Sequence, residues 1–241
     1  MGGSIMREVM TIAKLKSAGA AEKSDLEIYA SKRIPKPLPR DFYSRDPRKV
    51  SRDLLGKVLV RREQRTLLTA RIVEVEAYLG QNDPAAHSAC GRTPRNAVLF
   101  GPPGHSYVYF IYGNHYCFNV SCLPDGQAGG VLFRALQPLS GIGEMAAGRG
   151  ISIHPETTNY RKRTLDLRKL TTGPGRLAEA FAITRERDNG KDLTSIRSDL
   201  VIVDDGFRPH RIEITARIGI TKAAQHPLRY IIADNEFVSR L

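Results

Sequence analysis

The strand-forming segments of this chain follow one another at hairpin spacing, and this feature most constrains the fold. Two apolar runs on either side of Gly113-Asn114 predict a hairpin that fills residues 106–122. Alternating residues and short β-branched runs predict further strands at 57–61, 67–78, 130–136, 200–203, 212–220 and 228–232. We therefore expect an α+β protein, a single domain on a curved, mostly antiparallel, open-barrel-like sheet with surrounding helices and a protruding β-hairpin.

Helices and loops should surround this sheet. Short helices are predicted at residues 50–55, 141–150 and 176–183, with Leu54 and Leu55 facing inward. Gly, Pro, Asn and Asp crowd residues 81–103 and predict a loop, and the basic stretch 161–169 is interpreted as a solvated loop. Thr172-Gly173-Pro174-Gly175 precedes the last of these helices. It could present backbone N–H groups to a phosphate or simply form a capped turn.

The first 37 residues differ in composition from the rest, because they are rich in small, charged and proline residues. We interpret residues 1–37 as a flexible basic N-terminal arm, or more specifically a nucleic-acid tether, and residues 38–241 as one folded domain. Acidic residues in the arm argue against a transit peptide, and the apolar core of a secretory signal is missing. No apolar run reaches the ~18 residues of a membrane span, so no membrane association is expected.

The chain carries 37 Lys and Arg against 25 Asp and Glu, a formal net charge of +12. This excess predicts an anionic partner, with nucleic acid first, although solvated surface charge on an ordinary enzyme would give the same balance. The three cysteines are odd in number and indicate a reducing compartment rather than a disulfide framework. Cys117 and Cys122 have a spacing that common zinc motifs do not use, so no metal site is expected.

Two carboxylates occur in one predicted strand. Residues two apart share a face of a strand, so Glu74, Glu76 and Tyr78 should point the same way. Neighbouring carboxylates repel, and burial would raise the pKa of at least one of them, as a general base requires. A polar strand face with solvated glutamates is the alternative reading.

The predicted hairpin is unusually rich in aromatic residues. Alternation places Tyr107, Tyr109 and Ile111 on one face, and it places Tyr112 on the other face beside the turn. An aromatic side chain at a hairpin tip either rests on a neighbouring loop or enters a partner, for example as a wedge in a base stack.

Three further polar residues are candidates for a site, and two of them interrupt apolar strands. Asn119 and Arg134 each break an apolar strand, and His87 lies in the predicted polar loop. A buried amide or guanidinium needs hydrogen-bond partners, so a structural role is one reading of each residue. Together, on a basic chain, they predict the lining of one pocket.

Seven segments in this order resemble the alkyladenine (3-methyladenine) DNA glycosylase family, of the methylpurine-DNA glycosylase type. The resemblance extends over residues 40–241 and leaves the N-terminal arm outside. The segments that carry it are Arg71–Gly80, Ala85–Ser88, Thr93–Asn96, Tyr107–Gly113, Cys117–Val120, Val131–Leu136 and Thr172–Pro174.

The resemblance implies a monofunctional enzyme of DNA repair. Such an enzyme flips alkylated or deaminated purines out of duplex DNA and hydrolyses the N-glycosidic bond with a Glu-activated water, leaving an abasic site. It implies no cofactor, double-stranded DNA with damaged purines as the partner, and a monomer. The expected location is the cytoplasm, with the nucleoid in a bacterium, or the nucleus in a eukaryote.

The resemblance also implies a role for each matching residue. Glu76 matches the general base, and Arg134 with the backbone carbonyl of Ile218 matches the groups that hold the water. The base pocket is expected from Tyr78, His87, Tyr109 and Asn119, the DNA intercalation from Tyr112, and the DNA backbone contacts from Thr93, Arg95 and Gly113. The chain departs from the family at the hairpin tip, where Asn114-His115 replaces the usual apolar or aromatic residue after the glycine.

Two other functions remain open on the sequence. A non-catalytic protein that binds lesions in duplex DNA could use the same wedge and basic surface but would release no base. A nucleosidase acting on small nucleosides would need neither feature, and its rate would hardly respond to salt.

Overall fold

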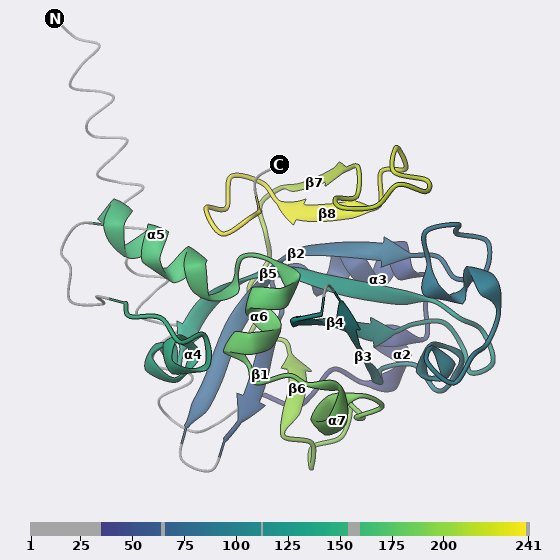
Figure 1. The fold of residues 1–241 in the computed structure, drawn as a ribbon, viewed down its shortest axis with the longest axis horizontal. Helices are drawn as coiled ribbons and strands as arrows, with labels where there is room; N and C mark the ends of the chain where they lie inside the picture. The colour runs from purple at the N-terminus through teal and green to yellow at the C-terminus, as the bar shows by residue number, and fades with distance from the viewer. Residues whose placement is uncertain (1–34, 64–65, 112, 154–159, 240–241) are drawn as a thin grey trace, which may run out of the picture. The chain divides into compact units, whose positions relative to one another are not determined.

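The computed structural model describes residues 35–63, 66–111, 113–153 and 160–239, and within them one antiparallel sheet organises the chain (Figure 1). Its main path runs β3-β4-β5-β2-β1-β6, and β8, which also pairs with β7, joins β2. The strands are β1 (Val58–Arg62), β2 (Leu67–Tyr78), β3 (Ser106–Ile111), β4 (His115–Ser121), β5 (Gly130–Ser140), β6 (Leu200–Val203), β7 (Ile212–Thr215) and β8 (Arg229–Ile232). The α+β class and the curled antiparallel sheet are confirmed.

Helices cover this sheet. In Figure 1, α6 lies in front of β5 and α3 lies behind β2. The α-helices are α2 (Arg40–Tyr43), α3 (Pro47–Leu54), α4 (Ile142–Gly148), α5 (Tyr160–Thr171), α6 (Pro174–Ala180) and α7 (Arg185–Asp188). The start of α3 follows from its sequence, because the Asp46 side chain accepts a hydrogen bond from the Arg48 amide and Pro47 occupies the first helical position.

The two faces of the sheet differ in chemistry. Alternate residues of β2, β4 and β5 enter the main core, among them the stacked rings of Phe118 and Phe133, whose centroids are 4.6 Å apart. The residues between them face the other way and include Glu76, Asn119 and Arg134. Period-two alternation therefore gives the sheet one apolar face and one face with polar and charged side chains.

The middle of β2 lies at the meeting point of three strands. The first part of β2 pairs with β1, the second part pairs with β8, and β5 runs along the opposite edge. The register with β5 shifts on both sides of Glu74, as at a β-bulge. Bulges re-aim side chains locally, and this one lies directly before Glu76.

Two predictions about local structure are wrong. The basic stretch 161–169 is part of α5 and not a loop, because Thr164, Leu167, Leu170 and Thr171 recur at helical spacing and turn inward. The predicted strand 212–220 ends at Thr215. Beyond it the chain leaves the sheet, since Arg217 enters a buried ion pair with Asp83 and Gly219 adopts φ +75°.

Most other local predictions agree with the structure. Leu54 and Leu55 are buried, and the predicted loop 81–103 contains only the single-turn 3₁₀ helices η1 (His87–Cys90) and η2 (Ala97–Phe100). Residues 1–34 and Tyr112 lie outside the described residues, so the predictions about the arm and the wedge stay predictions. No described helix is both long enough and apolar enough to cross a membrane.

Candidate active site

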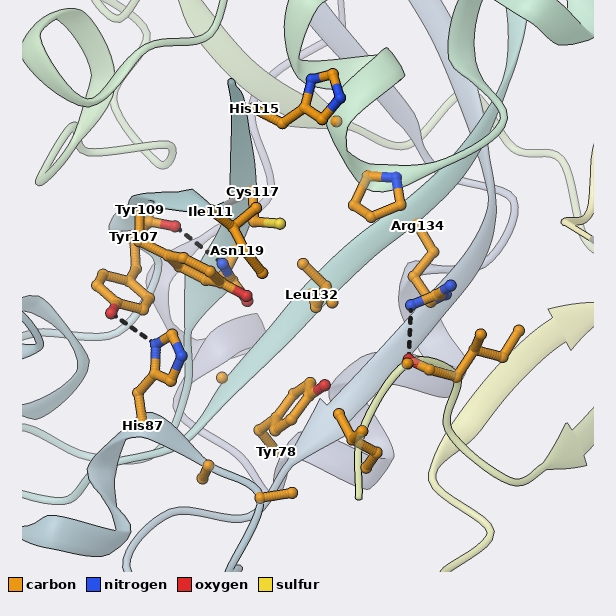
Figure 2. Close-up of a pocket in the computed structure, with 18 of the residues that line it drawn as sticks. Tyr78, His87, Tyr107, Tyr109, Ile111, His115, Cys117, Asn119, Leu132 and Arg134 are labelled. Carbon is orange, nitrogen blue, oxygen red and sulfur yellow. Dashed lines mark hydrogen bonds between the residues drawn. The ribbon is translucent and has the colours of Figure 1, made fainter. Parts of the chain in front are cut away.

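A cavity of about 430 Å³ opens on the chemically distinct face of the sheet (Figure 2). Its walls come from β2, β3, β4, β5, η1, the start of α6 and the loop after β7. The structure gathers six of the predicted site residues around this cavity: Tyr78, His87, Tyr109, Asn119, Arg134 and Ile218. Each comes from a different strand, 3₁₀ helix or loop, six in all, so the fold places them together although the sequence does not.

The seventh, Glu76, lies fully buried directly behind the cavity wall. Its Oε1 accepts a hydrogen bond of 2.8 Å from the Ile218 amide and lies 3.2 Å from Arg134 Nη1. Its Oε2 accepts a hydrogen bond of 3.0 Å from the Tyr78 hydroxyl. All three partners belong to residues that line the cavity. The Glu76 carboxylate therefore contacts the cavity lining directly, through Ile218, Arg134 and Tyr78.

The two carboxylates of β2 are both buried, but their pKa values are shifted in opposite directions. Burial raises the pKa of Glu76, and the attraction of Arg134 and the hydrogen bonds from Ile218 and Tyr78 offset it only in part. Burial also acts on Glu74, but hydrogen bonds from Arg229 and Ser239 outweigh it and lower the pKa of that group. The reading of β2 as a solvated polar face is wrong. The surroundings of Glu76 disfavour its ionised form, whereas those of Glu74 favour it.

Aromatic rings form the wall opposite Arg134. The rings of Tyr107 and Tyr109 have centroids 5.4 Å apart, and the His87 ring meets Tyr109 edge-on at 4.4 Å. Figure 2 shows Tyr78 on another side of the cavity, below Leu132 in this view. Tyr78 in turn carries the buried Arg217 guanidinium at 4.7 Å from its ring centroid. Flat electron-rich surfaces on two sides suit a planar, electron-poor ligand.

Polar groups punctuate this aromatic lining. His87 Nδ1 lies 2.9 Å from the Tyr107 hydroxyl, so its other ring nitrogen is left to face the cavity. Burial of part of the ring, followed by the charge of Arg95, lowers the pKa of His87 and keeps it neutral near pH 7. Asn119 Nδ2 donates to the Tyr107 carbonyl at 3.1 Å, which fixes the amide at the cavity wall. The cavity thus presents a few fixed hydrogen-bonding groups between apolar faces.

None of the predicted DNA-backbone residues lines the cavity. Arg95 is exposed, and its guanidinium lies 5.7 Å from the Tyr109 ring centroid. Thr93 forms a turn in which its amide donates to Asn96 Oδ1 at 2.7 Å. Gly113 is exposed at the hairpin turn with φ +74°. Nothing in the described residues assigns these positions to DNA, so their role stays a prediction.

Sequence reasoning missed several residues of the site. Arg176 and His115 line the cavity, and His115 Nδ1 lies 2.6 Å from Glu179 of α6, so the hairpin is tied to that helix. The His115 ring packs so closely on Gly175 that an added Cβ there would lie 2.9 Å from it. The Gly-Pro-Gly turn was the only signal in the sequence that pointed to this corner.

The described residues contain no group of three or more His, Cys, Asp and Glu side chains that could hold a metal ion. Cys90, near His87 in sequence, is exposed, and its Sγ donates to the His87 carbonyl.

Comparison with known proteins gives a consistent result. The model of a family described as methylpurine-DNA glycosylase matches residues 41–236. A protein from Koribacter versatilis is 64% identical over 203 residues, which cover 84% of this chain and 93% of that protein. A Burkholderia cenocepacia protein is 45% identical over 203 residues (84% and 90%), and one from Methanoculleus marisnigri is 46% identical over 208 residues (84% and 98%). Each of the three is named "Putative 3-methyladenine DNA glycosylase".

Proposed function

This chain belongs to the methylpurine-DNA glycosylase family, and we propose that it excises 3-methyladenine and related damaged purines from duplex DNA by hydrolysis. One observation carries the proposal: a single buried carboxylate with a raised pKa, Glu76, adjoins a cavity walled by Tyr78, Tyr109 and His87. The family and the names of the relatives support the activity. The geometry supplies a mechanism for it.

The cavity accounts for recognition of an extruded base. Flipping a nucleotide out of a duplex costs a few kcal/mol, and least for a damaged or mispaired base. Stacking on aromatic side chains returns about 1–3 kcal/mol per base. A purine that lies between Tyr78 and Tyr109 would therefore recover the cost of extrusion. An N-alkylated purine carries positive charge, so electron-rich rings favour it over an undamaged neutral base.

Hydrolysis needs one base and one held water. A water between Glu76, Arg134 and the Ile218 carbonyl would attack C1′ of the sugar while its proton passes to the Glu76 carboxylate. The electron pair of the C1′–N bond leaves with the purine, and a cationic alkylated purine thereby becomes neutral. No general acid is required for such a lesion, whereas most sugar hydrolases use two carboxylates. One buried glutamate is sufficient for this chemistry.

The pH dependence of excision tests the role of Glu76. A general base works only when it is ionised, and burial raises the pKa of Glu76 above the ordinary 4.5. We expect the single-turnover excision rate of 3-methyladenine to rise with pH through this raised pKa and to level off above it. The acid limb should lie at higher pH than a solvated glutamate would give. A rate that already levels off below pH 4.5 would contradict the assignment.

The function itself is tested with a panel of duplex oligonucleotides that carry different lesions. We expect duplexes with alkylated purines to give an abasic product. The logarithm of the binding constant for these duplexes should fall linearly with the logarithm of the salt concentration. A pure lesion-binding protein would bind these duplexes and release no base. A nucleosidase would act equally well on free nucleosides, with little response to salt.

The wedge is tested by Tyr112→Ala. If Tyr112 fills the gap that the extruded base leaves, the variant should bind lesion DNA about 5- to 150-fold more weakly, because it loses a stacking contact worth about 1–3 kcal/mol. The single-turnover rate at saturating enzyme should change much less. Tyr116→Ala, on the same hairpin with a ring that packs on exposed Phe110, is the matched control. Equal lesion affinity for Tyr112→Ala and the wild type would reject the wedge.

A further inference from the structure

The second carboxylate of β2 does not line the cavity, yet it is among the most heavily hydrogen-bonded groups in the described structure. Glu74 is fully buried. Its Oε1 accepts from Arg134 Nε at 2.9 Å, Arg229 Nε at 2.8 Å and Ser239 Oγ at 2.7 Å. Its Oε2 accepts from the Ser239 amide at 2.7 Å. Glu74 does not line the cavity, but it accepts four hydrogen bonds. Its effect on the site therefore has to come through the groups that it binds, above all Arg134.

Glu74 fixes the orientation of Arg134. A guanidinium is a rigid planar fork, so holding its Nε on one carboxylate sets the directions of both terminal nitrogens. Here Nη1 is left 3.2 Å from Glu76 Oε1 and 3.4 Å from the Ile218 carbonyl. Without Glu74, the same fork would be free to form the bidentate pair that arginine prefers with a carboxylate. Such a pair would stabilise the anion of Glu76 and weaken it as a base.

The charge of Glu74 acts on Glu76 in the same direction. The hydrogen bonds that lower the pKa of Glu74 keep it ionised, and its negative charge adds to the burial that raises the pKa of Glu76. The charged and titratable groups that face Glu76 are Arg134 from β5, Tyr78 and Glu74 from β2, Cys117 from β4, and Arg217 from the loop after β7. Among them, Glu74 opposes the attraction of Arg134.

The segment after β8 completes this arrangement. Ser239 reaches Glu74 because the chain turns back over the sheet beyond Ile232. The Phe237 carbonyl accepts from Thr172 Oγ1 at 3.0 Å, and Arg229 Nη2 donates to the Ser239 carbonyl at 2.9 Å. Phe237 is itself buried in the main core. Residues 233–239 are therefore anchored at two points next to the catalytic cluster.

We propose that Glu74 and Ser239 are positioning residues of the excision reaction, and that residues 233–239 belong to the active site. Glu74 holds Arg134 away from a bidentate pair with Glu76, and Ser239 holds Glu74 in the orientation that does so. The inference rests on the proposed function of Glu76 as the general base. It assigns no contact with DNA to either residue.

The test compares Glu74→Gln and Ser239→Ala with the wild type. Removing the charge of Glu74 ends its repulsion of Glu76 and frees Arg134 to pair with Glu76, so both effects lower the pKa of Glu76. We expect the acid limb of the single-turnover excision rate to move to lower pH in Glu74→Gln. The plateau rate should fall roughly 10- to 100-fold, because a weaker and misaligned base drives the reaction. Affinity for lesion DNA should stay within about threefold, since neither residue faces the cavity.

Ser239→Ala keeps the carboxylate and should give a smaller change of the same sign. Ser140→Ala is its matched control, because that hydroxyl bonds Thr69 and Leu67 on the same sheet away from the cavity. If Glu74→Gln does not fold, Ser239→Ala carries the test alone. An unchanged acid limb in both variants, or in Ser239→Ala alone when Glu74→Gln is unfolded, would overturn the inference.

A readout without catalysis separates the two proposals. The Glu76 carboxyl can be titrated by ¹³C NMR in the free protein, and its pKa should fall in Glu74→Gln, or in Ser239→Ala if that is the folded variant. If the wild-type protein excises no base, the proposed function is rejected. The NMR titration still tests whether Glu74 raises the pKa of Glu76. An active wild type whose Glu76 titrates identically in the variant would reject only the present inference.

Discussion

Glu76→Gln is expected to abolish base release while lesion binding is kept. Glutamine has nearly the same shape. Its amide oxygen can still accept from the Ile218 amide and its NH2 group can donate to the Tyr78 hydroxyl oxygen, but it cannot take a proton from water. Loss of a general base lowers a rate by about 10²–10⁴-fold. Single-turnover excision of 3-methyladenine from a duplex oligonucleotide measures this loss. Binding of the same duplex by the variant measures what is retained.

The thermal stability of Glu76→Gln shows whether the loss of base release comes from loss of the general base or from loss of folding. A carboxyl whose pKa is raised on folding binds its proton more tightly in the folded state, so its stabilising effect is present at low pH and is lost as pH rises through the raised value. At pH 7 the ionised Glu76 therefore destabilises the fold, and Glu76→Gln should show a thermal midpoint no lower than that of the wild type. Glu144→Gln, at an exposed carboxylate of α4, is the matched control for activity. Wild-type turnover by Glu76→Gln would end the assignment.

The sequence predicted which side chains share the face of the candidate site because one physical rule governs it. Side chains two apart in a strand share a face, and this rule grouped Glu74, Glu76 and Tyr78 on β2 and Tyr107 with Tyr109 on β3. The polar interruptions at Asn119 and Arg134 fell on the same face for the same reason. Alternation is a local property, so a single sequence is enough to read it.

Helical and irregular segments were harder because their determinants are not local. The basic run of α5 looks like a solvated loop until the core contacts of Leu167 and Leu170 are known. The strand predicted up to Ile220 ends early because Arg217 meets Asp83, 134 residues away in sequence. No local sequence pattern predicts an ion pair between residues so far apart in the chain.

The same limit applies to the support of the active site. Ser239 and Arg229 converge on Glu74 from 165 and 155 residues away. Their residue types are common on any basic surface. The pairing of β8 with β2 brings Arg229 to Glu74, and the path of the chain after β8 brings Ser239 there, so this cluster becomes visible only in three dimensions.

Burial of arginine is equally hidden in the sequence, and it leads to the largest expected effect on stability. Arg61 of β1 is fully buried, and its terminal nitrogens bind both oxygens of Asp188 in α7, at 2.9 and 2.7 Å. Its Nε donates to the Phe181 carbonyl at 3.2 Å. Arg61→Met keeps the apolar stem and removes the guanidinium. We expect it to lower the free energy of unfolding by about 3–5 kcal/mol, since it leaves a buried carboxylate and a buried carbonyl without this partner.

The consequence extends to the cavity wall. The segment that follows Asp188 covers the edge of β3: Asn189 Oδ1 accepts from the Val108 amide at 3.0 Å, and the Lys191 carbonyl accepts from the Ser106 amide at 2.9 Å. An uncovered edge strand loses these hydrogen bonds, and β3 is the strand that carries Tyr107 and Tyr109. Arg61→Met should therefore also increase amide hydrogen exchange in β3 before the whole sheet opens.

Arg208→Met provides the control, because Arg208 makes a comparable double contact with Asp204 but is 63% exposed. Exposed pairs contribute below about 1 kcal/mol, since water and salt screen them and compete for both groups. Urea unfolding of the two variants compares the loss of a buried and of an exposed arginine–aspartate pair. The change in midpoint reports stability as long as the slope m is unchanged. If both variants lose the same free energy of unfolding, burial does not set the strength of the Arg61–Asp188 pair. The edge of β3 would then have to be held by the Asn189 and Lys191 contacts alone.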